Sequence, residues 1–581
     1  MPARTGPVHV VTTKRAYKDK VYCTHLLRRS YREDGKVKNE TLGNLSHLPE
    51  SLVDMIRCSL QGQTFVPLGD AFQITRSRTH GHVRAISSAM QRLGLASLIG
   101  STPCRERDLV LAMVASRIAF ADTKLATTRR WHACTLAEDF GVADADEDDL
   151  YAAMDWLLTR QDAIQSKLAA RHLSAGGLVL YDLSSSYFEG STCPLARRGY
   201  SRDGKPGTLQ VNYGLLTDAR GCPVAVSVFE GNTADSKTFM PAVQRVRQDF
   251  GVQQVVMVGD RGMVSQKAID ELRQTDGMGW ITALKSVSIR ALVEQGQLQM
   301  GLFDERNLVE LASPDYPGER LVACRNDALA KLRAHKREEL LKATEATEAS
   351  LLEVQASVDA AKLRGQDKIG VRVGKIINKY KMAKHFELSI ADASLAWTRR
   401  QDNIDAEAAL DGLYIIRTSV SAGQMDAPTC VRNYKSLANV ERAFRSLKTI
   451  DLKVRPIHHR LENRVRSHIF LCMLAYYVEW HMRQAWAPLT FTDTDQAAKA
   501  TRDPVAPAKR SKAAQDKAAS HTLPDGQSVH SFATLMADLA TIVSNTCRSP
   551  KTAPDSPTFN VLTTATAHQL KAIALIDAIK L

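Results

Sequence analysis

The sequence lacks the features that would assign it to several specialised classes of protein. Its ten cysteines are scattered over 581 residues, and no two have C-x-x-C spacing, so we expect neither a zinc ribbon nor a disulfide framework. The first twenty residues contain no apolar segment typical of a signal peptide. The longest uncharged apolar stretch, 467–478, is too short to span a bilayer. No short repeat period indicates a solenoid. We therefore expect a cytoplasmic protein with reduced thiols and no membrane partner.

The composition is that of an ordinary globular protein. Hydrophobic residues make up 44% of the chain and charged residues 24%, which excludes a mainly disordered chain. The length predicts three or four domains. Lys and Arg number 77 and Asp and Glu 63, so the net charge is +14. This basic excess favours a polyanionic partner without identifying it.

The hydrophobic pattern changes twice along the chain. Residues 8–45 contain strand-like runs around the turn sequence DGK, with basic residues interleaved with tyrosines. Solvated charge and contact with DNA phosphates both explain that pattern. Residues 82–173 have helical periodicity. From 177 onward, apolar strand-like runs and one helical segment follow in the order β-β-β-α-β, which predicts a mixed sheet.

Two aspartates each end an apolar run. Asp182 ends LVLYD, and Asp260 ends VVMVGD before the turn signal Arg261-Gly262. A single aspartate in such a place is most simply a turn or helix-capping residue. Two on neighbouring strands would repel each other unless they share a cation.

A third acidic residue, Glu441, lies in the helical segment YKSLANVERAFRSLK. At 100° per residue, Tyr434 lies at about +20° from Glu441, and Leu437 at about −40°. Arg445 lies at about +40° and Lys448 at about −20°. A solvated ion pair between Glu441 and Arg445 would explain part of this face. It does not require Tyr434 or Leu437 in the same stripe.

Together the three carboxylates indicate a specific chemistry. Oxygen ligands from two strands and one helix suit Mg²⁺ or Mn²⁺. Two such ions about 4 Å apart clamp the attacking and leaving oxygens of a phosphoryl transfer. Tyr434, Arg445 and Lys448 would then contact the phosphates beside the scissile bond.

The motifs resemble those of a known family, the DDE transposases of bacterial insertion sequences, in the insertion-sequence-four-like branch. In that branch the helix carries Tyr, then Arg three residues on, Glu four further and Lys seven further. This chain has Tyr434, Leu437, Glu441 and Lys448 at that spacing, with Leu where the family often has Arg. Arg442 or Arg445 is the expected substitute for that phosphate contact. The blocks YDLSSSYFEG, GYSRDGK, YGLLTDARGCPVAVSVFEGNTADSKTF, GDRGM, ITALK, DGLYIIRTS and RPIHHRLENRVRSHIFLCMLAYYV also resemble the family, in the expected order.

The resemblance implies a fold, a reaction and partners. The fold class is α/β: a ribonuclease-H-like mixed sheet flanked by helices, with Asp182, Asp260 and Glu441 holding two Mg²⁺ ions, for which Mn²⁺ can substitute. The implied function is transposition of a mobile element. The protein would bind its terminal inverted repeats, cleave them with a metal-activated water and join the 3′-hydroxyl ends to target DNA, as a homodimer in the DNA complex. Two alternatives are a non-catalytic DNA-binding derivative and a metal-dependent nuclease without strand transfer. Its implied location is the bacterial cytoplasm, at the nucleoid when DNA-bound.

The long interval between Asp260 and Glu441 implies an inserted domain. Residues 328–365 form its expected long helical segment and 366–384 a basic stretch. Trp397 is either a buried structural residue or a stacking surface for an extruded base. The expected divisions are a hairpin-rich module at 1–80, a helical domain at 81–175, the first part of the core at 176–285, the insertion at 286–405, the second part of the core at 406–488, and a polar linker with a C-terminal helix at 489–581.

Overall fold

The computed structural model describes residues 5–17, 20–63, 65, 72–299, 301, 303–346, 350–495, 501–548 and 557–580. They form two compact units. One comprises Met1–Ser77 and Ser544–Leu562, and the other Arg78–Val543 and Thr563–Leu581. No helix in these ranges has both the length and the apolar character that a bilayer crossing requires.

The smaller unit contains an antiparallel three-stranded sheet, as the two strand-like runs predicted. Strands β1 (Val8–Tyr17), β2 (Lys20–Glu33) and β3 (Lys36–Asn44) pair in that order. Asp34 and Gly35 both have positive φ in the turn between β2 and β3, which is the geometry of a tight hairpin. Helix α1 (Glu50–Leu60) packs against β1. A second sheet joins β4 (Gln73–Thr79) to β16 (Val543–Arg548) and β17 (Phe559–Leu562), which come from the far end of the chain.

The larger unit begins with helices, as the periodicity predicted. Helix α4 packs against α2, α7 and α18, and its residues from Leu109 to Ile118 are all buried. Helix α18 contains the apolar stretch 467–478, and every residue from Ser467 to Met482 is buried, which confirms a core helix. The helices of this region are α2 (Gly81–Arg92), α3 (Leu95–Ile99), α4 (Arg105–Ala119), α5 (Lys124–Arg130), α6 (Leu136–Asp139), α7 (Glu147–Leu158), α8 (Gln161–His172) and, later in the chain, α18 (Glu462–Ala485).

A nine-stranded mixed sheet follows, and it confirms the predicted α/β class. Its strands are β5 (Gly177–Tyr187), β6 (Arg197–Arg198), β7 (Leu209–Asp218), β8 (Pro223–Glu230), β9 (Val255–Val258), β10 (Met278–Ala283), β11 (Leu308–Leu311), β12 (Arg320–Arg325) and β15 (Leu413–Thr418). Strand β7 is antiparallel to both β5 and β8, whereas β5, β9 and β10 are parallel. The strand order β8-β7-β5-β9-β10 with these directions is the ribonuclease-H-like arrangement.

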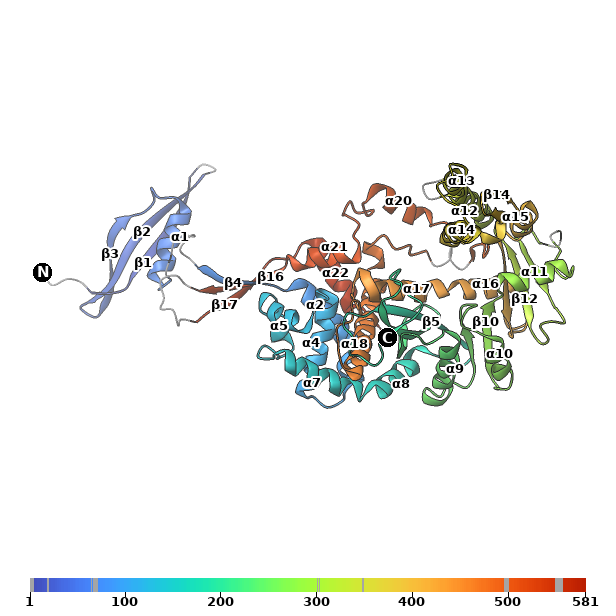
Figure 1. Ribbon diagram of the computed structural model, residues 1–581. Helices are drawn as coiled ribbons and strands as arrows, with labels where there is room; N and C mark the ends of the chain where they lie inside the picture. Colours follow the sequence, from blue (N-terminus) through green and yellow to red (C-terminus); the bar gives the residue numbers. More distant parts are fainter. Residues whose placement is uncertain are drawn as a thin grey trace. The chain divides into compact units, whose positions relative to one another are not determined.

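Helices cover both faces of this sheet. Helices α16 (Ala427–Lys435) and α17 (Leu437–Arg445) run along one side, and α9 (Ser236–Gln244) and α10 (Gln266–Arg273) along the other (Figure 1). Successive residues of β5 face opposite sides because side chains alternate along a strand. The Tyr181 ring packs against Phe239 of α9 at 6.3 Å between centroids, so Asp182 faces α17.

The region expected to be inserted differs from the 286–405 estimate. Strands β11 and β12 belong to the central sheet through antiparallel pairing of β12 with β15. The separate core lies instead in α12 (Asp327–Ala346), α13 (Leu351–Asp359), α14 (Gln366–Tyr380), β13 (Phe386–Ala391), β14 (Ser394–Arg399) and α15 (Gln401–Ala408). The long helical segment is therefore two helices, and the basic stretch is α14. Trp397 packs edge-on against Phe386 in this core, which favours its structural interpretation.

The expected polar linker contains regular structure. Helix α20 (Lys512–Ser520) is capped by Ser511, and Lys517 donates hydrogen bonds to the carbonyls of Thr490 and Thr492. Helix α21 (Phe532–Ala540) follows, and α22 (Ala567–Asp577) is the predicted C-terminal helix. The linker assignment is corrected here: the Ala- and Lys-rich composition that indicated a linker also has high helix propensity. Residues 496–500 and 549–556 of this segment lie outside the described ranges.

Gly214 of β7 lies against the buried Tyr181 ring, so we predict that Gly214→Ala destabilises the sheet. A Cβ at Gly214 would lie 2.7 Å from ring carbons of Tyr181, which has no room to move. We expect the free energy of unfolding to fall by about 1–3 kcal/mol, measured by urea denaturation. Gly374→Ala in α14, where a Cβ meets nothing within 4 Å, is the matched control and should be neutral or slightly stabilising. Equal stability of the two variants would contradict the prediction.

Candidate active site

Parallel pairing places the two strand aspartates side by side. Strand β5 pairs with β9 in a register that matches Gly177 with Val255 and Leu180 with Val258, an offset of 78 residues. Asp182 and Asp260 are separated by the same 78 residues, so the two carboxylates lie abreast on neighbouring chain segments. Asp260 follows β9 as predicted.

Asp182 was predicted to end its strand, but β5 continues beyond it to Tyr187. The polar sequence Ser184-Ser185-Ser186 remains in the strand since each hydroxyl has a buried partner. Ser184 accepts from Lys448 Nζ at 3.1 Å, Ser185 accepts from the Arg202 backbone N–H at 3.1 Å, and Ser186 bonds Tyr213 Oη at 2.8 Å. The carboxylate therefore lies in the middle of a strand whose polar end is internally satisfied.

The electrostatics of Asp182 reflect its crowded surroundings. Burial, together with the negative charges of Asp260 and Glu441, raises the pKa of its carboxyl to about 7. The Leu183 N–H, which donates to Asp182 Oδ1 at 2.8 Å, and the Arg202 guanidinium oppose that pKa shift. Three carboxylates thus repel one another here, and the nearby positive charge offsets the repulsion only in part.

The helical face deduced around Glu441 is present, although the helix is not continuous. It is interrupted at Ser436 between α16 and α17 and ends as a π-turn, Ser446–Ile450. A cavity of about 580 Å³, which we call the carboxylate cavity, opens between this face and β5. It is lined by Asp182, Asp260 and Glu441, by the predicted helix residues Tyr434, Leu437, Arg445 and Lys448, and by Leu183, Ser184, Tyr200, Arg202, Asp235, Met263, Lys435, Ala438 and Phe444.

Two of the predicted phosphate-contacting residues are engaged by carboxylates. The Tyr434 hydroxyl donates to Asp260 Oδ1 at 3.3 Å, and burial raises the pKa of Tyr434. Lys448 is buried, and its Nζ lies 2.5 Å from Asp203 Oδ1. Burial lowers the pKa of Lys448, while Asp203 opposes that change. Both side chains therefore help to fix the walls of the cavity.

The two arginines of the helix differ from each other. Arg445 is exposed and lines the carboxylate cavity, and within the described ranges its guanidinium has no ion-pair partner. Arg442 is exposed and does not line the cavity. Of the two proposed substitutes for the missing arginine at Leu437, only Arg445 is in position.

The loop 199–205 contributes residues that the sequence analysis did not assign. Asp203 has 1% side-chain exposure and pairs with both Lys448 and Arg455, and its Oδ2 accepts from the Tyr187 N–H at 2.9 Å. Arg202 pairs with Asp235 at the edge of the cavity. The block GYSRDGK was a recognisable signal, but the loop has no periodicity from which to assign a direction to each side chain.

A second cavity, of about 520 Å³, lies beside Arg455, and we call it the basic cavity. Six Lys and Arg side chains and three histidines line it, with Asp122 as the only carboxylate: Arg117, Lys124, Lys453, Arg455, Arg460, Arg464, His458, His459 and His468. Lys124 has 5% exposure and lies 3.4 Å from His468 Nδ1. Burial and the neighbouring Arg117 lower the pKa of Lys124 to about 7. Asp122 pairs with Arg130, and in the described part of the chain neither Lys124 nor Arg117 pairs with a carboxylate.

Comparison with known proteins assigns the chain to a family. Residues 179–478, just over half of the chain, match the model of the transposase DDE domain, so the chain belongs to the DDE transposases. Membership implies transposition by phosphoryl transfer. Residues 10–63 match the N-terminal domain of IS1634 family transposases. No curated protein sequence matches the chain.

Among solved structures, one similar chain is that of a piggyBac transposase synaptic complex with hairpin DNA. Its sequence identity to this chain is 9%, the alignment covers 81% of this chain and 88% of the other, and the TM-score is 0.26. That score is too low to support an argument about the fold.

We predict that Asp203→Asn destabilises the protein, because it leaves the buried Lys448 and the partly buried Arg455 without their shared carboxylate. The free energy of unfolding should fall by about 3 kcal/mol in denaturant titrations. Asp162→Asn removes a carboxylate that is 87% exposed from its pair with Arg245, and should change stability by less than about 1 kcal/mol. A loss for Asp203→Asn no larger than that of the control would show that this pairing does not stabilise the site.

Proposed function

We propose that the protein is a transposase that cleaves the ends of its own mobile element and joins them to target DNA at the carboxylate cavity. The observation that carries this proposal is the common offset of 78 residues, which places Asp182 beside Asp260 and opposite Glu441 of α17. Within the insertion-sequence transposases, the spacing of Tyr434, Glu441 and Lys448 favours the insertion-sequence-four-like branch.

The donor set fits the divalent cations that this family uses. Three carboxylates converge on one cavity, where burial and then their mutual repulsion raise the pKa of Asp182. A bound cation relieves that repulsion. Asp182, Asp260 and Glu441 would hold two Mg²⁺ ions, or Mn²⁺ in their place. Bound there, the ions would supply Lewis-acid activation of the attacking oxygen and charge neutralisation at the leaving oxygen.

The protein's own side chains have separate tasks in this proposal. The Tyr434 hydroxyl orients Asp260 through its hydrogen bond, and the Asp203 pairs hold Lys448 and Arg455 in place. Arg445 and Arg202 are the cations at the rim that can meet the phosphates flanking the scissile bond. Arg442, which is exposed and does not line the cavity, would contact DNA outside it.

The basic cavity supports a DNA partner for this site. Arg455 lines it and pairs with Asp203, and Asp203 also pairs with Lys448 of the carboxylate cavity, so these ion pairs connect the walls of the two cavities. A phosphate group would compensate the buried charges of Lys124 and Arg117. We propose that the terminal inverted repeat runs from one cavity to the other, with a homodimer bringing two ends together.

We expect Asp182→Asn, Asp260→Asn and Glu441→Gln each to reduce strand cleavage by at least about 1000-fold. Binding of a labelled inverted-repeat duplex should change little, because these residues hold ions rather than DNA. Cleavage is measured on denaturing gels in Mg²⁺. Asp270→Asn, an exposed aspartate on α10 outside the cavity, is the control and should cleave normally.

The same assay distinguishes the alternatives. Cleavage that survives in purified Asp260→Asn protein would overturn the assignment, and wild-type protein that binds ends without cutting would indicate a non-catalytic derivative. Pre-cut ends with free 3′-hydroxyls test joining directly. Cutting without joining would indicate a nuclease.

We predict that Lys124 makes DNA binding pH-dependent. Its pKa of about 7 in the empty cavity means that it is half charged near neutrality, and a bound phosphate favours the charged form. Affinity should therefore fall as pH rises from 6 to 9 at fixed salt, measured by fluorescence anisotropy. His459 and His468 have lowered pKa values and stay neutral over this range.

Lys124→Met should weaken binding about tenfold at pH 6 and flatten the pH profile. Lys512→Met, which removes an exposed lysine of α20, should keep the wild-type profile. A Lys124→Met protein with unchanged affinity and profile would show that the DNA does not enter the basic cavity.

A further inference from the structure

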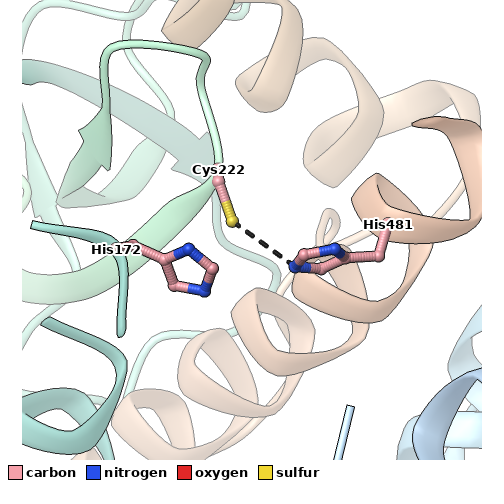
Figure 2. A group of neighbouring side chains, drawn as sticks. All are labelled: His172, Cys222 and His481. Carbon is pink, nitrogen blue, oxygen red and sulfur yellow. Dashed lines mark hydrogen bonds between the residues drawn. The ribbon is translucent and has the colours of Figure 1, made fainter. Parts of the chain in front are cut away.

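Three potential metal ligands meet far from one another in the sequence. His172 is the last residue of α8, Cys222 lies in the turn between β7 and β8, and His481 lies on α18. One ligand atom from each lies within 4.8 Å of the other two, and in the described part of the chain no other group of three His, Cys, Asp or Glu residues does so. Figure 2 shows the thiol directed toward the space between the two imidazole rings.

The separations suit a small tetrahedral ion. Cys222 Sγ lies 3.8 Å from His481 Nε2. Zinc–sulfur and zinc–nitrogen bonds of about 2.3 and 2.0–2.1 Å at a tetrahedral angle place these two atoms about 3.6 Å apart. For this pair a small inward shift is enough to bind an ion, and the His172 ligand atom lies within 4.8 Å of both.

The surrounding contacts orient the ligands. His172 Nε2 lies 3.1 Å from the Tyr477 hydroxyl, which leaves Nδ1 for a metal. This division of the two ring nitrogens is usual for a metal-bound histidine. The Cys222 backbone N–H donates to Asp218 Oδ1 at 2.9 Å and so fixes the turn that carries the thiol.

Charges of both signs surround the cluster. A divalent ion with two neutral imidazoles and one thiolate carries a net charge of +1. The buried Asp218 carboxylate lies close enough to affect both His172 and Cys222, and it is also paired with Arg220 at 2.8 Å. The convergence of the three ligand atoms, and not this charge, is what favours an ion.

We propose that His172, Cys222 and His481 bind one zinc ion, with water at the fourth position. Two nitrogens and a sulfur are borderline-soft donors that select zinc, in contrast to the all-oxygen carboxylate cavity, which suits Mg²⁺. The ion ties the end of α8 and the β7–β8 turn to α18. The cluster shares no residue with the carboxylate cavity, so the ion stands apart from the proposed reaction. Without an ion, a thiol–imidazole hydrogen bond would explain the contact between Cys222 and His481, and the Tyr477 hydroxyl and ring packing would hold His172. The metal content of the protein distinguishes the two explanations.

The direct test is the zinc content of untagged, full-length protein measured by elemental mass spectrometry. We expect about one zinc per chain in the wild type and in Asp260→Asn, and its loss in Cys222→Ser and His481→Gln. Cys324→Ser removes another cysteine with 0% exposure, outside the cluster, and should retain zinc. Tyr477→Phe should weaken zinc binding about tenfold, measured by competition with a chelating dye.

Cobalt substitution provides a measurement that does not depend on whether variants fold. Wild-type protein reconstituted with Co²⁺ should show the intense visible bands of a tetrahedral site and a thiolate-to-cobalt charge-transfer band in the near ultraviolet. Wild-type protein that neither retains zinc nor gives these bands overturns the proposal. So does Cys222→Ser protein that keeps its full zinc content.

Discussion

Repulsion between carboxylates is the constraint on which the rest of this structure depends. The parallel pairing of β5 with β9 brings Asp182 beside Asp260, and α17 adds Glu441 from the opposite side. A fold gains no stability from gathering like charges in a partly buried cavity. The arrangement is understandable as a site that a divalent cation completes, and the sheet, the helices and the loop 199–205 hold the three residues in position.

Positive charge is divided between structure and recognition. Lys448 and Arg455 are held by Asp203, while Arg445 is exposed without an ion-pair partner in the described ranges, and Lys124 and Arg117 are buried without a carboxylate. The basic residues of the chain therefore fall into two groups with different roles. Buried pairs stabilise the cavity walls, and uncompensated cations offer places for phosphate. The net charge favoured a polyanion but did not distinguish these roles.

Periodicity predicted much of the site and of the fold. Helical geometry placed Tyr434, Glu441, Arg445 and Lys448 on one face, and the apolar runs located Asp260 at a strand end. It also predicted the mixed sheet, the N-terminal hairpins and the buried helix α18. Helices and strands have a fixed number of residues per turn or per repeat. The spacing of residues in the sequence therefore determines on which face of the element each side chain lies.

Contacts between segments far apart in the sequence could not be predicted from residue spacing. The role of Asp203 depends on an irregular loop meeting a helix, and strands β11 and β12 join a sheet that their local sequence does not specify. The zinc ligands are separated by 50 and 259 residues, beyond any recognisable ligand motif. Strands β16 and β17 pair with β4 from the other end of the chain, a pairing that no local pattern in the sequence indicated.

The central claim is that the carboxylate cavity holds the ions that act on the scissile phosphate. Its most direct test is cleavage of an inverted-repeat end that carries a single phosphorothioate at that phosphate. Sulfur binds Mg²⁺ poorly and Mn²⁺ better. The account predicts that the substitution slows cleavage strongly in Mg²⁺ and that Mn²⁺ restores the rate. Equal rates for oxygen and sulfur substrates in Mg²⁺, or the same slowing in both metals, would contradict it.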